Sequence, residues 1–182
     1  MTGMTIDGSQ TNGVEIRRIE QSSIHRFLFF VSEYLSSGRV LDYGCGRVGT
    51  CKEPEPYKSL VESLESEYVG WDPVDGPLGG VMGTFSAILC TQAIHYSPSP
   101  ILTLQTLGMF LPPGGHIVMT YPTTWAELTE EGMMEIYRIT RGGMEVLLKA
   151  SGFKVVVHEE RARIVIPGFS LALGYGVVGR KL

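Results

Sequence analysis

The chain has few cysteines, no cluster of basic residues and no long apolar run. It contains three cysteines among 182 residues, and none of them belongs to a C-x-x-C pair. Such usage is typical of a reducing compartment, so we expect a cytoplasmic protein without a disulfide framework. The net charge is −4 and the Lys and Arg residues are dispersed, which disfavours a nucleic-acid partner. Every apolar stretch is far shorter than the ~20 residues of a membrane-spanning helix, so no membrane partner is expected.

The length and the N-terminal composition suggest one domain preceded by a tail. A chain of 182 residues suits a single domain with a sizeable core. The first residues, MTGMTIDGSQTNG, are polar and rich in turn formers, and no secretory signal is recognisable among them. We therefore expect a disordered tail over residues 1–13 and a single domain over residues 14–182.

Short apolar segments alternate with amphipathic ones along the chain. Ser22 or Ser23, Pro56 and Thr140 are suited to the first turns of helices. The spacing of apolar residues predicts helices over residues 22–36, 55–66, 99–110 and 140–150, strands over 39–43, 67–71, 85–90, 116–121 and 153–160, and further extended segments over 162–166 and 175–181. This alternation favours an α/β fold with a doubly wound, mostly parallel sheet. Ligands of such sheets bind at the carboxyl ends of the strands, where we expect the site.

The segment RVLDYGCGRVGTCKEPEP, residues 39–56, allows three interpretations. It could be a cofactor loop, a metal site built on Cys45 and Cys51, or an ordinary turn between a strand and a helix. A structural zinc site requires four ligands, commonly in paired spacing, so we expect no metal. Asp42, placed just before the glycines, would not help to bind a pyrophosphate. It would form a charge-assisted hydrogen bond with a ligand that carries a cationic amine.

Five segments in order resemble the class I methyltransferases that use S-adenosylmethionine (SAM). They are RVLDYGCG (39–46), YVGWDP (68–73), FSAILCTQAIHY (85–96), FLPPGGHIVMTYP (110–122) and IYRITRGGMEVLLKASGFKVV (136–156). The last segment resembles bacterial members often found with cell-surface polysaccharide genes. The resemblance implies a Rossmann-like domain, SAM as the cofactor, and a small-molecule acceptor such as a sugar or a sugar-derived metabolite.

The resemblance also implies the roles of individual residues. Asp42 would steer the amine of SAM, Asp72 would bind the ribose hydroxyls, and Trp71 or Pro73 would flank the adenine. The remaining residues would lie against the methionine part or the transferable methyl group, which completes the cofactor-binding set: Asp42, Tyr43, Gly44, Cys45, Gly46, Trp71, Asp72, Pro73, Thr91 and Gln92. His95 matches the family's histidine and is the catalytic candidate, either as a general base or as a residue that orders the rim.

Two departures from the family pattern stand out. Residues 47–53 and the prolines at 54 and 56 postpone the helix after the glycines, which leaves the role of Gly49 open. Only residues 73–84 lie where the family has a third strand with its helices, and twelve residues span at most ~40 Å. We therefore expect that strand to be missing, the adenine pocket to be open, and SAM affinity to be weak. A homodimer could cover the open sheet edge.

The favoured function is direct methyl transfer from SAM to a small molecule, which makes the chain an enzyme. One alternative is a SAM-binding partner or regulatory protein with little or no turnover, an interpretation favoured by the short segment 73–84. A second alternative is a Rossmann oxidoreductase that uses NAD, although Asp42 and the PPGG sequence argue against it. Methyl transfer to RNA or protein is disfavoured by the absence of a basic patch.

Overall fold

A seven-stranded sheet forms the centre of the molecule. The computed structural model describes residues 4–7, 13–36, 38–46, 55–72, 75–78, 83–123, 129–130, 133–134 and 136–182. The strand order is β1-β8-β9-β5-β4-β2-β3. The strands are β1 (Met4–Asp7), β2 (Arg39–Tyr43), β3 (Glu67–Trp71), β4 (Ala87–Thr91), β5 (His116–Pro122), β8 (Phe153–Ile166) and β9 (Phe169–Lys181). A separate small hairpin pairs β6 (Thr129–Glu130) with β7 (Met133–Met134).

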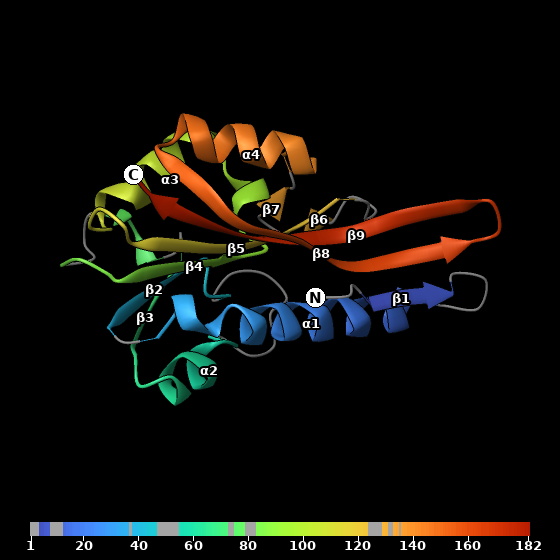
Figure 1. Ribbon diagram of the computed structural model, residues 1–182, viewed down its shortest axis with the longest axis horizontal. Helices are drawn as coiled ribbons and strands as arrows, with labels where there is room; N and C mark the ends of the chain where they lie inside the picture. Colours follow the sequence, from blue (N-terminus) through green and yellow to red (C-terminus); the bar gives the residue numbers. More distant parts are fainter. Residues whose placement is uncertain are drawn as a thin grey trace.

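Strands β3, β2, β4 and β5 are parallel, whereas β9 runs antiparallel to both of its neighbours. Helices α1 (Gly13–Phe30) and α2 (Lys58–Ser63) cover one face of the sheet, and α3 (Pro100–Met109) and α4 (Arg141–Ala150) cover the other (Figure 1). Every residue of β4 is buried, as expected of a strand covered on both faces. The prediction of a doubly wound, mostly parallel α/β sheet is therefore confirmed.

The sheet ends at β3, as the short segment after Asp72 predicted. Strand β3 pairs with β2 and occupies the last position of the strand order. Within the described parts of the connection to β4, residues 75–78 and 83–86, none belongs to a strand. The edge strand expected at this position in the family is thus missing from the described sheet.

The N-terminal part of the chain differs from its prediction. Helix α1 begins at Gly13 and not at residue 22, so neither Ser22 nor Ser23 is its N-cap. Both hydroxyls donate instead to carbonyls within the helix, those of Arg18 and Glu20, at 2.9 and 2.7 Å. Such bonds let serine sit inside a helix, which makes it an ambiguous marker of a helix start. Residues 4–7, expected within the tail, pair with β8 as β1, so that expectation is wrong for this segment.

Helix α2 begins at Lys58, three residues later than predicted. Glu55 has φ of 60°, which is incompatible with a helix, and Tyr57 is the N-cap. The prediction for α4 is confirmed, because the Thr140 hydroxyl accepts a hydrogen bond from the Gly143 amide at 3.1 Å. Residues 153–166 form one long strand rather than the two segments predicted, and a turn at Gly168 (φ 79°) connects it to β9.

Candidate functional site

Glycines shape the turn that follows β2. Gly44 and Gly46 have φ of 78° and 81°, a conformation that favours glycine. A Cβ on Gly44 would lie 2.6 Å from the Cβ of Ala93, which follows β4. The amides of Gly44 and Cys45 both donate to the carbonyl of Trp71, at 2.8 and 3.2 Å. The turn therefore packs tightly between the ends of β3 and β4.

Asp42 is completely buried at the end of β2. The Tyr68 hydroxyl donates to its Oδ2 at 2.7 Å. Its other oxygen, Oδ1, has no hydrogen-bond partner among the described residues. Burial raises the pKa of Asp42 to about 7, while the bond from Tyr68 opposes the shift and the charges of Glu55 and Asp72 add to it. A cation at Oδ1 would restore the charged form of this carboxylate.

Asp72 links the end of β3 to the glycine turn. It is 3% exposed, and its Oδ2 accepts a hydrogen bond from the Gly46 amide at 3.2 Å. Its own amide donates to Oδ2 of Asp75 at 2.7 Å. The preceding Trp71 stacks on Tyr43 with ring centroids 5.1 Å apart. Pro73, predicted to flank the adenine, lies outside the described residues.

Thr91 and Gln92 lie at the end of β4. Thr91 is buried, whereas Gln92 is partly exposed and adopts φ of 51°, unusual for a residue other than glycine. The Gln92 amide donates to the Thr120 carbonyl at 2.9 Å, which fastens this bend to the neighbouring strand β5. A strained bend at a ligand-binding rim is a recurrent feature of functional sites.

His95 lies in the 3-10 turn Ile94–Tyr96 and is only 2% exposed. Its carbonyl accepts hydrogen bonds from the amides of Ile136 and Tyr137, at 3.0 and 3.2 Å. Burial, and after it the positive charge of Arg138, lower the pKa of His95 to about 3. The imidazole is therefore neutral at physiological pH. Its Nδ1 has no hydrogen-bond partner in the described part of the chain.

Most of the predicted site residues come together at one end of the sheet. Asp42 and Tyr43 are the last two residues of β2, and Gly44 to Gly46 follow it. Trp71 ends β3 and Thr91 ends β4, with Asp72 and Gln92 directly after them. Glu55 and Tyr68, which surround Asp42, were not predicted as site residues. Tyr68 could have been found from the sequence. It lies two residues before Gly70, the register partner of Asp42, and therefore on the same face of the neighbouring strand. No such signal in the sequence marked Glu55, because an acid between two prolines is typical of a loop.

Metal binding finds no support within the described residues. No group of three or more His, Cys, Asp or Glu side chains there could hold a metal ion. Cys45 and Cys90 are buried and belong to no disulfide within the described residues, and Cys51 lies outside those residues. In the same described part, no helix has the length and apolar character to cross a membrane.

Comparison with known proteins identifies the class. Residues 16–158 match the family model described as a methyltransferase domain, and the chain belongs to this family. Its fold is that of the class I SAM-dependent methyltransferases, and SAM is the cofactor of that class. No curated protein matches the sequence.

Solved structures share this fold at low identity. A SAM-dependent methyltransferase from Mesorhizobium loti is 15% identical, with a TM-score of 0.62 over 90% of this chain and 100% of that one. The Burkholderia thailandensis 1,6-didemethyltoxoflavin-N1-methyltransferase, solved with bound 1,6-didemethyltoxoflavin and S-adenosylhomocysteine, is 16% identical, with a TM-score of 0.53 over 97% and 93%. The [4+2]-cyclase SpnF is also 16% identical, with a TM-score of 0.53 over 86% and 80%.

The residues of the rim fit SAM. Unpartnered buried polar atoms are rare in folded proteins and require an explanation. Among the described residues, such atoms in this region include Asp42 Oδ1, Trp71 Nε1 and His95 Nδ1. The first is an acceptor suited to a cation. Trp71 is the last residue of β3, and His95 lies in the 3-10 turn after β4; these two strands flank β2. The glycine turn follows β2 directly, between these two strands.

Proposed function

We propose that the protein transfers the methyl group of SAM to a small-molecule acceptor. The observation that carries this proposal is the set of unpartnered buried atoms beside the glycine turn, within a chain of the methyltransferase-domain family. When bound, SAM supplies a methyl group already activated on a sulfonium. The protein then has to bind the cofactor, align the acceptor and exclude water.

Each predicted residue would contact a different part of SAM. Gly44, Cys45 and Gly46 would lie against the methionine part, with Asp42 near its amine. Asp72 would take the ribose hydroxyls in exchange for its bond to the Gly46 amide. Trp71, with Pro73, would flank the adenine. Thr91 and Gln92 would face the methyl group.

His95 is better suited to alignment than to general base catalysis. A base works best with a pKa near the operating pH, and the pKa of His95 is lowered to about 3. A neutral imidazole with a free Nδ1 can still form a hydrogen bond with an acceptor. SAM, held by the residues above, would supply the methyl group, and His95 would orient the acceptor atom that receives it.

A sugar or a sugar-derived metabolite is the proposed acceptor class, on the resemblance of residues 136–156 to polysaccharide-associated members. The Burkholderia thailandensis neighbour binds 1,6-didemethyltoxoflavin, which supports an acceptor of small-molecule size. The buried thiols of Cys45 and Cys90 suit a cytoplasmic protein. A homodimer could cover the edge at β3.

A screen of sugar and sugar-nucleotide acceptors for S-adenosylhomocysteine formation tests the proposal. We expect turnover with at least one acceptor, lost in Asp72→Ala. Full activity of His95→Ala would withdraw any role of His95 in the reaction. Binding of SAM without turnover on any acceptor would favour the second candidate, a SAM-binding regulatory protein.

Two observations favour that second candidate. The sheet ends at β3, which leaves the adenine side without the family's usual strand. SpnF, whose name describes a cyclase, has the same fold, so this fold does not by itself imply methyl transfer.

A further inference from the structure

The lengthened loop after the glycine turn ends at a residue with an unusual backbone. Glu55 lies between Pro54 and Pro56 and has φ of 60°. Its amide donates to the Cys45 carbonyl at 2.8 Å, so the chain returns to the turn at this point. Glycine would adopt this conformation without strain, and a strained non-glycine residue is a reason to look for a function of its side chain.

The Glu55 side chain reaches the bare surface of β3 at Gly70. A Cβ on Gly70 would lie 2.9 Å from Glu55 Oε1, 3.2 Å from Cys45 Sγ and 3.2 Å from a ring carbon of Tyr68. Gly70 is the register partner of Asp42 on the adjacent strand, so both face the same side of the sheet. The absence of a side chain at Gly70 therefore leaves space that the Glu55 carboxylate enters, on the side where Asp42 is buried.

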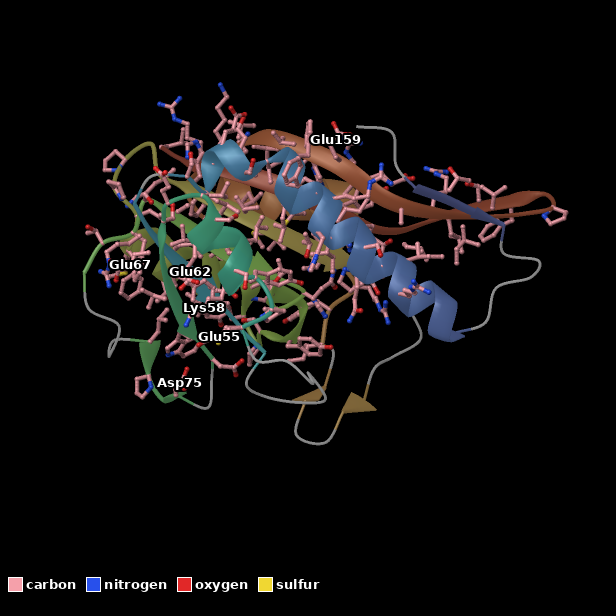
Figure 2. All side chains as sticks on the ribbon, turned by 90° about the horizontal axis from the view of Figure 1, so that it is seen from below. Glu55, Lys58, Glu62, Glu67, Asp75 and Glu159 are labelled. Carbon is pink, nitrogen blue, oxygen red and sulfur yellow. The ribbon has the colours of Figure 1, made fainter. Side chains whose placement is uncertain are left out.

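The groups around this space are mainly acidic. Tyr68 donates to Asp42 Oδ2, and Asp72 contributes a further negative charge to the surroundings of Asp42. The ammonium of Lys58 lies 3.7 Å from the other Glu55 oxygen, Oε2, at the exposed side. Figure 2 shows Glu55 and Lys58 at the start of α2, with Glu62 further along the helix. Asp42 Oδ1, buried and unpartnered among the described residues, borders the same region.

We propose that Glu55 acts with Asp42 as a second carboxylate for the ammonium group of the cofactor's amino acid. This inference rests on the proposed function, which places the methionine part against residues 44–46. A single buried carboxylate next to a partly exposed one suits an organic cation that enters from the rim. This role would account for the added length of the loop, since the Glu55 amide bonds the Cys45 carbonyl and the carboxylate lies beside the turn.

Binding of two ligands to the full chain tests the inference. S-adenosylhomocysteine carries the amino acid, whereas 5′-methylthioadenosine has the same adenosine and a thioether but no amino acid. Glu55→Gln should weaken S-adenosylhomocysteine binding about tenfold or more in calorimetry, as expected for the loss of a charge-assisted contact. The affinity for 5′-methylthioadenosine should stay unchanged. Glu62→Gln, the same change at an exposed position of α2, should alter neither affinity.

Equal weakening of both ligands would overturn the inference, because it would indicate a structural role in the loop. An unchanged affinity of Glu55→Gln for S-adenosylhomocysteine would also overturn it. Glu55→Gly removes the carboxylate while relieving the backbone strain, so it should fold at least as well and show the same selective loss. If the wild type binds neither ligand, the proposed function itself fails, which is a distinct result.

Discussion

Asp42→Asn should make the ligand-free protein more stable at alkaline pH and not at acidic pH. Burial raises the pKa of Asp42 from 3.8 to about 7. The folded state therefore binds this proton more tightly than the unfolded state does, and the free energy of unfolding falls as pH rises from about 4 to 7. At about 1.4 kcal/mol for each pKa unit, the ionised carboxylate costs about 4 kcal/mol above pH 7.

Asparagine removes that cost and still offers an oxygen to the Tyr68 hydroxyl. Its amide nitrogen would occupy the place of Oδ1 without a described partner, at a cost of about 1–3 kcal/mol. We expect a net gain of about 1–3 kcal/mol at pH 8 and a net loss at pH 4. Urea denaturation of both proteins from pH 4 to 8 measures this difference. A difference that does not vary with pH would refute the reasoning.

Three further predictions concern the turn, the histidine and a buried arginine. Gly44→Ala should lower the free energy of unfolding by about 2–4 kcal/mol in urea denaturation, because φ is positive and the Ala93 methyl lies 2.6 Å from the new Cβ. Gly76→Ala, which has open space around its Cβ, should lower the same free energy by only about 1 kcal/mol. The imidazole signals of His95 should not titrate between pH 5 and 8 by NMR, since its pKa is lowered to about 3; a midpoint near 6.5 would contradict the burial described. Arg161→Met should lower the free energy of unfolding by about 3–5 kcal/mol, because the buried guanidinium bonds Ser23 and the Tyr175 carbonyl and lies 3.6 Å from Glu20; a loss below 1 kcal/mol would argue against this network.

The strands of the parallel sheet could be predicted because their sequences are distinctive. The residues of β4 are apolar or small throughout. β2 carries an acid at its next-to-last position and is followed by Gly44 and Gly46, so both the type and the position of these strands could be predicted. The end of the sheet at β3 followed from the length of segment 73–84, which is too short for the strand and helices of the family pattern. Helix α4 carried an N-cap threonine that the structure uses as predicted.

Other features depend on contacts that a local pattern does not contain. The start of α1 was obscured by serines that bond within the helix. Strand β1 exists through its pairing with β8, whose residues lie 158 positions further along the chain (Met4 opposite Ala162). Within the site, the residues at strand ends were found because topology brings such ends together. Tyr68 was missed although its position beside Asp42 on the neighbouring strand offered a signal. Glu55 was missed because its position depends on the side-chain space left open at Gly70.

Calorimetric titration of the purified chain with S-adenosylhomocysteine and, separately, with NAD measures whether the rim of the sheet binds SAM through the residues assigned to it. We expect one S-adenosylhomocysteine bound per chain, with binding lost in Asp72→Ala, and no heat of binding with NAD. Binding of NAD without binding of S-adenosylhomocysteine would contradict the proposed function.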